Sequence, residues 1–397
     1  MEILLDRPNI VNMNITKLIT AFLIVSSCFS SLLSAQSLDE INTITTAVPF
    51  LRIAPDARSG AMGDAGIATT PDAFSIHWNP AKLSFAEEDM AFGLSYTPWL
   101  RELVGDIYAA NLGGYKKLDD KQTLAFSLLY FSLGTINFTD MNGQDAGTFM
   151  PREFKIDGAY SRKLSDNLSL GVALRYIYSS LASGQFVGGA EIKPGTSAAA
   201  DISLYYQKPL ELMEKNAVLS FGANISNIGA KITYTESAQK DFIPTNLGLG
   251  GALTVDLDDY NKLMVTADIN KLLVPTPQAP VNGVYEYKDL SVASGMFGSF
   301  SDAPNGMKEE FREIMYSAGL EYWYDQQFAV RAGYFYEHPT KGNRQYLTAG
   351  LGMKLNVFNL GVSYLVPTND QRNPLDETLR FSLGFDFSAF QEGKKSE

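Results

Sequence analysis

The chain has 397 residues, of which 45% are apolar, and it carries a formal net charge of −12. Its mean hydropathy of −0.06 and the lack of an apolar run of about 18 residues after the N-terminal segment exclude a helical membrane protein. The acidic balance argues against nucleic acid as a partner. Cys28 is the single cysteine, so we expect no disulfide framework and no thiol chemistry.

The N-terminal segment has the pattern of a secretory signal peptide. Lys17 supplies the positive charge, residues 18–33 are apolar with small side chains, and Ser34 and Ala35 form a small-residue cleavage site. We therefore expect residues 1–35 to be removed on export.

Two details of this segment have alternatives. Either Met1 or Met13 is the true start, because residues 1–12 add charges ahead of an ordinary signal sequence. Residues 25–28 loosely match the motif for lipid attachment at Cys28, which would leave the mature protein lipid-anchored. Continued apolar residues after Cys28 favour conventional cleavage.

Strict alternation of apolar and small or polar residues recurs many times between residues 91 and 390. The clearest example is the segment 168–178. Its even-numbered positions are the apolar Leu168, Leu170, Val172, Leu174, Tyr176 and Tyr178, and its odd-numbered positions include Ser169, Gly171, Ala173 and Arg175. The last copy places Phe381, Leu383, Phe385 and Phe387 on one side and ends near the aromatic Phe390. Strands of about 9–11 residues with this pattern suit a barrel wall that has lipid outside and a polar lumen inside.

Fourteen segments have this alternation, an even number as a closed bacterial barrel requires. They are residues 91–99, 106–116, 122–134, 153–163, 167–179, 197–207, 217–229, 244–256, 261–270, 314–324, 327–337, 345–357, 358–366 and 378–390. We predict an all-β fold, a transmembrane antiparallel β-barrel over residues 91–390, with residues 391–397 as a periplasmic tail. The inner face of a soluble sandwich would alternate too.

The connections distinguish these two folds. Every second connection is tight, as at 118–120, 165–166, 258–259, 325–326 and near Asn356. The intervening ones, near 135–152, 180–196, 230–243, 271–313 and 367–377, are longer and richer in Gly, Pro and Asn. Short periplasmic turns and long extracellular loops give this asymmetry in outer-membrane barrels, and a sandwich has no reason to show it.

Residues 36–90, between the predicted signal peptide and the predicted barrel, do not have the pattern of the strands. Residues 59–68 are nearly all small, and residues 71–73 and 77–82 indicate turns and not a strand. This run and the turns after it resemble the N-terminal hatch of the FadL family of hydrophobic-substrate channels, which implies a fourteen-stranded barrel with a plug in its lumen. The matching motif residues are Gly60, Gly63, Asp72, Asn79, Pro80 and Ala81.

Residues 47–53, 60–66 and 78–82 resemble one branch of that family more closely, PorV of the type IX secretion system. The resemblance implies a location in the outer membrane of a Gram-negative, Bacteroidetes-like cell, surrounded by outer-membrane lipid. It further implies that the protein binds the C-terminal signal domain of secreted cargo. It would take that cargo from the translocon barrel of the system and deliver it to attachment-complex proteins.

The long connection near 271–313 is the candidate binding surface, because loops of this length are usually functional or disordered. Its candidate contact residues are the aromatic side chains and methionine Tyr285, Tyr287, Met296, Phe297 and Phe300. These residues either form an adaptable binding patch or fold over the barrel mouth as a lid. The alternative function is a FadL-like channel for hydrophobic small molecules, although no cluster of basic residues is evident that would hold a carboxylate head group.

The sequence gives little support for catalysis. The two histidines, His77 and His338, fall in the hatch and in an outer loop, so neither a histidine-rich metal set nor a histidine dyad is expected. The Gly-rich stretch at 60–66 does not follow a strand, which argues against a nucleotide site. We expect no enzyme activity, no cofactor and no metal. In the lumen, Arg175 and Asp386 are candidates for a stabilising ion pair.

Overall fold

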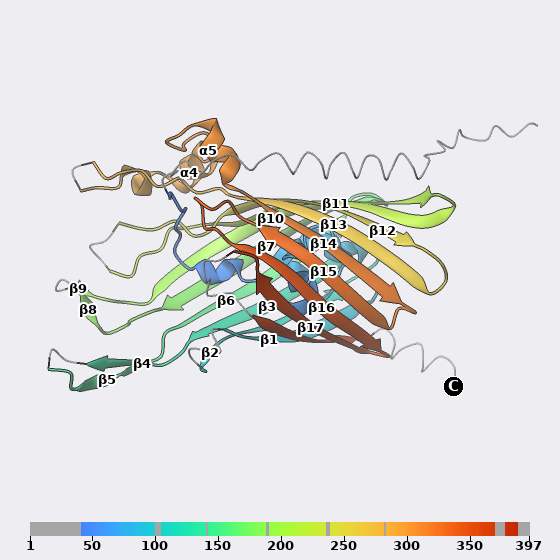
Figure 1. The fold of residues 1–397 in the computed structure, drawn as a ribbon, viewed down its shortest axis with the longest axis horizontal. Helices are drawn as coiled ribbons and strands as arrows, with labels where there is room; N and C mark the ends of the chain where they lie inside the picture. Colours follow the sequence, from blue (N-terminus) through green and yellow to red (C-terminus); the bar gives the residue numbers. More distant parts are fainter. Residues whose placement is uncertain are drawn as a thin grey trace, which may run out of the picture.

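Fourteen antiparallel strands form one closed barrel, in which each strand pairs with its neighbours in sequence and β1 pairs with β18 (Figure 1). They are β1 (Met90–Pro98), β2 (Ile107–Lys117), β3 (Gln122–Leu133), β6 (Arg152–Lys163), β7 (Leu168–Ser180), β10 (Gly195–Leu212), β11 (Lys215–Gly229), β12 (Asn246–Asp256), β13 (Asn261–Leu272), β14 (Ile314–Tyr324), β15 (Phe328–Tyr336), β16 (Gln345–Leu355), β17 (Phe358–Pro367) and β18 (Leu379–Asp386). The predicted barrel and its strand number are confirmed.

This computed structural model describes residues 41–99, 105–139, 142–187, 190–235, 239–281, 283–369 and 378–387. The predicted signal peptide with Cys28, the end of the last predicted strand at Phe390 and the predicted tail at 391–397 lie outside the described residues. Among the residues described, no helix is both long enough and apolar enough to cross a membrane.

Alternate side chains of each strand face the lumen and the outside of the barrel, as predicted. In β7 the side chains of Ser169, Ala173 and Ile177 are buried toward the lumen, whereas Leu170 and Leu174 are exposed on the outside. The same alternation continues around the barrel, because antiparallel pairing places equal parities side by side. The outer wall is therefore apolar and the inner wall is largely small or polar.

The β10–β11 hairpin extends further than predicted. We expected β10 to end at residue 207, but it continues to Leu212, and Met213 and Glu214 turn the chain with φ of 52° and 64°. Two left-handed residues form the tight turn that suits a twisted hairpin. Pro209 has no N–H to donate, but β10 pairs with β7 only as far as Tyr206, so the proline lies on a free edge where its missing N–H is tolerated.

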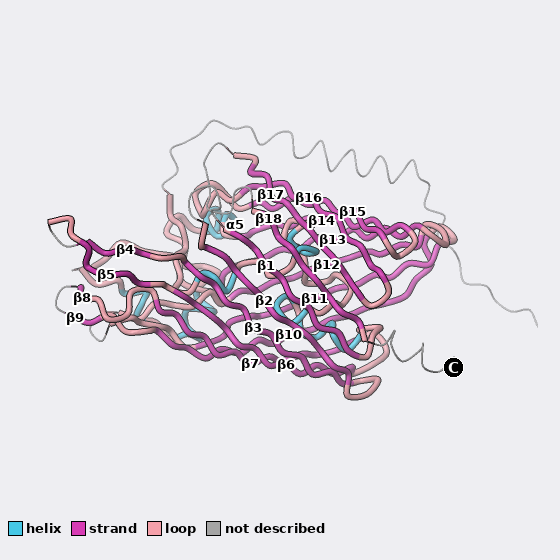
Figure 2. Tube along the Cα trace, turned by 90° about the horizontal axis from the view of Figure 1, so that it is seen from below, coloured by secondary structure: helices cyan, strands magenta, loops and turns pink. Residues whose placement is uncertain are grey.

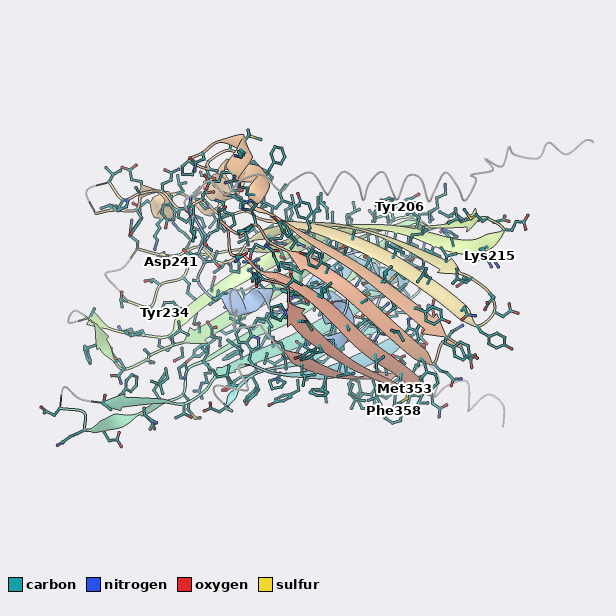
Figure 3. The ribbon with its side chains drawn as sticks, in the orientation of Figure 1. Tyr206, Lys215, Tyr234, Asp241, Met353 and Phe358 are labelled. Atoms are coloured by element: carbon teal, nitrogen blue, oxygen red, sulfur yellow. The ribbon has the colours of Figure 1, made fainter. Side chains whose placement is uncertain are left out.

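The two ends of the barrel differ as predicted. Lys215, Met353 and Phe358 lie toward the end with the tight turns, whereas Tyr234 and Asp241 lie among the long connections at the other end (Figure 3). Two of the long connections contain short hairpins that the sequence did not indicate, β4 (Ile136–Thr139) with β5 (Asp145–Phe149) and β8 (Phe186–Val187) with β9 (Ala190–Glu191). The connection after β13 carries η3 (Glu286–Asp289), α4 (Val292–Gly298) and α5 (Met307–Arg312).

Residues 48–86, here called the inner segment, lie within the ring of strands in both views (Figures 1 and 2). The segment forms η1 (Pro49–Arg52), α2 (Ala57–Gly60), α3 (Ser75–Trp78) and η2 (Pro80–Phe85), and most of its residues are buried. Its helices are short because prolines, glycines and polar caps interrupt them. The inner segment contacts β6, β7 and β10 through η2, and β16, β17 and β18 through α2, so it bridges opposite parts of the wall.

Candidate functional site

Small residues allow the inner segment to lie directly against the wall. A Cβ atom on Gly60 would come within 2.9 Å of the Arg380 side chain, and one on Gly63 within 2.5 Å of the Tyr334 carbonyl oxygen. Gly63 also has a φ of +67°, which favours glycine, and its N–H donates to Thr348 Oγ1 at 2.9 Å. Both predicted motif glycines therefore occupy positions where a larger residue would clash.

Asn79, Pro80 and Ala81 start η2 and fasten it to the wall. The Asn79 side chain caps η2 by accepting from the Ala81 N–H at 3.0 Å, and its Nδ2 donates to the carbonyl oxygen of Leu204 in β10 at 3.0 Å. Pro80 occupies the first turn, where its missing N–H leaves no bond unmade. The Ala81 carbonyl accepts from Ser169 Oγ of β7 at 2.6 Å.

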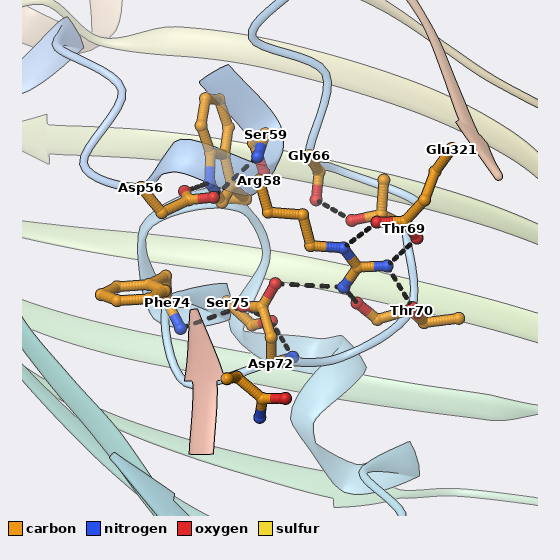
Figure 4. A network of polar contacts seen from close by, with 12 residues as sticks. Asp56, Arg58, Ser59, Gly66, Thr69, Thr70, Asp72, Phe74, Ser75 and Glu321 are labelled. Atoms are coloured by element: carbon orange, nitrogen blue, oxygen red, sulfur yellow. Dashed lines mark hydrogen bonds and ion pairs between the residues drawn. The ribbon is translucent and has the colours of Figure 1, made fainter. Parts of the chain in front are cut away.

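Asp72 belongs to a polar network around Arg58 (Figure 4). Its carboxylate accepts from the Phe74 N–H at 2.9 Å and from Arg58 Nη1 at 3.2 Å. Arg58 also bonds Glu321 of β14, with Nε–Oε2 at 2.8 Å and Nη2–Oε1 at 2.7 Å. All six predicted motif residues are thus placed in one packed body, and their role as a gate stays a prediction.

The predicted pairing of Arg175 with Asp386 is wrong. Arg175 Nε bonds Asp157 at 2.5 Å and its Nη2 bonds Asp201 at 3.0 Å, both on strands adjacent to its own. Asp386 of β18 instead pairs with Lys354 of β16 at 3.3 Å. The strand order explains why the predicted pair does not form. Side chains on adjacent strands can meet in the lumen, but Arg175 and Asp386 are separated by several strands.

The base of the connection after β13 is buried. Leu272 and Val274 pack with Phe242, Phe335 and Leu365 in one apolar cluster at the end of the barrel wall. The backbone of this stretch is also tied to its neighbour, because the Leu273 N–H donates to the Thr245 carbonyl at 2.8 Å. The connection therefore leaves the barrel from a fixed point and is not a free linker over its whole length.

A group of five charged residues holds the returning part of this connection; we call it the loop clamp. It consists of Lys271, Glu309, Glu310, Glu313 and Lys341. Glu313 lies at its centre, with Oε2 at 2.5 Å from Lys271 Nζ and Oε1 at 2.9 Å from Lys341 Nζ. Burial opposes ionisation of Glu309, but the Lys341 ammonium holds the pKa of that carboxyl below its usual value.

Beyond the clamp, the connection exposes apolar side chains, which we call the loop surface. Its members are Val281, Val284, Tyr285, Leu290, Phe297, Phe300, Met307 and Phe311. Of the five predicted contact residues, Tyr285, Phe297 and Phe300 belong to it, whereas Tyr287 and Met296 are half-buried. The Tyr285 and Tyr287 rings meet edge to face at 5.8 Å. The connection is therefore buried at its base and exposed on η3, α4 and α5.

We expect Glu313→Gln to loosen the connection while the barrel stays assembled. Two buried lysines lose their shared carboxylate, and breaking a buried ion pair costs about 3 kcal/mol. Cleavage of the connection by an added protease should then become about 100-fold faster, because a tenfold change corresponds to about 1.4 kcal/mol. Glu286→Gln, on an exposed residue of the same connection, is the control and should leave the cleavage rate unchanged.

A family model for the type IX secretion system protein PorV matches residues 36–279. A search of curated proteins finds no match. Among solved structures, a ΔS2S3 mutant of the monoaromatic hydrocarbon channel TodX is similar over 83% of this chain and 96% of that chain, at 13% identity and a TM-score of 0.51. The Pseudomonas putida toluene transporter TodX covers 87% of this chain and 98% of its own, at 13% identity and a TM-score of 0.48.

The structural likeness, at such low identity, shows the fold alone. The family match spans more than half of the chain and includes the whole inner segment and the first nine strands of the barrel wall. Fold and family match lead to the same conclusion. This chain is an outer-membrane β-barrel, and it belongs to the PorV family of type IX secretion system proteins.

Proposed function

We propose that the protein binds the C-terminal signal domain of secreted cargo at the cell surface, takes it from the translocon barrel and hands it to the attachment machinery. Membership of the PorV family supports a part in type IX secretion in general. The observation that carries the finer assignment is the loop surface. In this proposal the protein works by binding and not by catalysis, in the outer membrane of a Bacteroidetes-like cell.

The loop surface has the chemistry of a protein-binding site. Phe297 is 80% exposed, Phe311 63% and Met307 58%, although all three are large apolar residues. Exposed apolar groups of this kind mark interaction sites, and flexible methionine side chains adapt to different partners. Such a surface suits the binding of a protein domain by apolar contacts.

The loop clamp supports the same assignment, because a binding surface must be presented in one arrangement. Glu309 and Glu313 of the α5 region bond Lys341, which lies on the neighbouring β15–β16 connection. A segment ordered before binding loses less conformational entropy when its partner arrives. We infer that the clamp preorganises α4 and α5 for cargo.

The test is capture of a purified cargo signal domain by the detergent-solubilised protein. Phe297→Ser together with Phe311→Ser should weaken binding by at least about 100-fold, because truncation of a central aromatic contact typically costs more than 1–2 kcal/mol. The folded barrel should be unaffected, since both side chains are exposed.

Tyr260→Ser supplies the matched control, because Tyr260 is an exposed aromatic residue on a tight turn at the opposite end of the barrel. Its affinity for cargo should equal that of the unchanged protein. Equal affinity of the Phe297 and Phe311 double variant would remove the loop surface from the proposal.

Uptake of a hydrophobic small molecule is the second candidate function, and the likeness of the barrel to a hydrocarbon channel favours it. In this case the inner segment would move to admit the molecule. Saturable uptake of a hydrophobic tracer should then change when Asn79 and Pro80, which fasten η2 to the wall, are both replaced by alanine. Uptake that is insensitive to these changes would count against a gated channel.

A further inference from the structure

A polar cavity of about 100 Å³ lies in the lumen, between the inner segment and the wall. Arg52, Asp64 and His77 line it from the inner segment, and asparagines of β11, β12 and β13 line it from the wall. Arg344, in the β15–β16 connection, lies at the same cavity. The cavity is large enough for a small ion with water, which needs polar partners on several sides.

The charges at this cavity do not balance. Arg52 Nη2 lies 2.9 Å from Met315 Sδ, and Arg344 Nη2 lies 3.6 Å from the same sulfur, so the two guanidinium groups converge. Glu337 is their common carboxylate, but it bonds Arg344 at 2.7 and 3.1 Å and lies 3.9 Å from Arg52. Arg52 therefore has only a distant counter-charge and a sulfur contact.

The remaining charged groups around the cavity do not compensate Arg52. Asp64 lies 3.8 Å from Arg380 and accepts from Tyr346 Oη at 2.6 Å, so its charge offsets that of Arg380. The Arg52 guanidinium is charged at neutral pH. One positive charge is in excess, on a side chain that is half-buried with 23% of its surface exposed, and a partly buried charge without a close partner is unfavourable.

Polar atoms around the cavity also lack partners. Within the described part of the chain, Asn224 Oδ1, Ser317 Oγ, Asp64 Oδ1 and His77 Nδ1 are buried without a hydrogen bond, and all four residues line this cavity. Asn224 Nδ2 donates to the Trp78 carbonyl at 3.0 Å, which fixes the direction of its oxygen. Buried polar groups normally have partners, so these atoms indicate a polar occupant.

We propose that this cavity is a binding site for a compact anion with its hydration water, held by Arg52 and Arg344. The anion supplies the missing negative charge, and its water or hydroxyl groups donate to Asn224 and Asp64. Because Arg52 belongs to η1 and Arg344 to the β15–β16 connection, the bound anion ties the inner segment to the end of the barrel that carries the long connections. The anion is either a free inorganic ion or the carboxylate of a longer ligand.

The experiment measures the melting temperature of the detergent-solubilised protein in sodium chloride, bromide, phosphate, acetate and a long-chain fatty acid. Sodium gluconate, whose polyhydroxylated chain is bulky and strongly hydrated, serves as the reference salt and keeps the ionic strength constant. We expect a saturable rise of about 2–4 °C with at least one compact anion. Arg52→Gln should abolish the rise, and Arg52→Lys, which keeps the charge, should retain it. Arg152→Gln, an exposed arginine at the same end of the barrel, should leave it unchanged.

A rise with inorganic ions alone assigns the site to a free ion, whereas a rise with fatty acid at much lower concentration than with acetate assigns it to a carboxylate head group. Anomalous scattering from bromide within about 4 Å of Arg52 in crystals of the unchanged protein would locate the ion directly. The proposal is overturned if no anion shifts the melting temperature relative to gluconate, or if Arg52→Gln shows the same shift as the unchanged protein.

Discussion

Replacement of Glu321 by alanine is expected to lower the free energy of unfolding by about 3–5 kcal/mol, because it leaves the half-buried guanidinium of Arg58 and the buried guanidinium of Arg331 without their shared carboxylate. Arg58 bonds both oxygens of Glu321 at 2.7 and 2.8 Å, and Arg331 Nε bonds Oε2 at 2.7 Å. Glu321 itself is only 2% exposed, so water cannot replace the lost partner. Reversible urea unfolding in lipid vesicles measures the change.

The control for Glu321 is an ion pair on the surface of the same barrel. Asp256 and Lys262 pair at 3.2 Å across a tight turn, with side chains 44% and 40% exposed. Asp256→Ala should change the free energy of unfolding by less than about 1 kcal/mol. Equal effects of the two replacements would mean that the Arg58–Glu321 contact does not hold the inner segment to the wall.

The second large effect is expected from Gly333→Val. A Cβ atom at Gly333 would overlap the backbone of Met62 and Gly63, and backbone atoms cannot move aside as a flexible side chain can. We expect more than about 3 kcal/mol of destabilisation, at the upper limit of overpacking effects. The inner segment should then leave its position, so the variant should show an increased conductance in planar bilayers.

Gly158 is the matched position for this test, because a Cβ atom there would meet no atom within 4 Å. Gly158 lies in β6 on the exposed face, and Gly158→Val should preserve both stability and conductance. An unchanged conductance of Gly333→Val in a folded barrel would show that the lumen does not depend on this backbone contact.

The barrel could be predicted from sequence because lipid imposes one simple rule on every strand. Alternate residues must be apolar, and that pattern survives in short segments such as 168–178. The rule fails where the strand leaves the membrane, and the end of β10 beyond residue 207 was missed for that reason. Hairpins within the long connections carry no alternation strong enough to identify them.

The candidate site was less predictable, because its parts are distant in sequence. The aromatic residues Phe297 and Phe300 were identified from composition alone, but Met307 and Phe311 of α5 were missed. Glu309 and Glu313 do have the four-residue spacing of one helix face, which was an available signal for the clamp. Their lysine partners, Lys271 at the end of β13 and Lys341 in the β15–β16 connection, are distant in sequence and carry no local pattern.

The interior cavity was also not predictable from the sequence, because its residues are distant along the chain. No cluster of basic residues that would hold a carboxylate head group is evident in the sequence. Arg52 and Arg344 lie 292 positions apart, yet the closed barrel brings both guanidinium groups to one sulfur atom. Only barrel closure and the path of the inner segment determine that meeting.

The most direct test of cargo binding is site-specific photocrosslinking in living cells, with a photoreactive residue at Phe297 and, in a separate strain, at Tyr260. Both positions are exposed, but they lie at opposite ends of the barrel. The proposed function predicts that Phe297 crosslinks to the C-terminal domains of several secreted proteins and that Tyr260 does not. Crosslinks from Phe297 to none of these proteins, in cells that still secrete them, would contradict it.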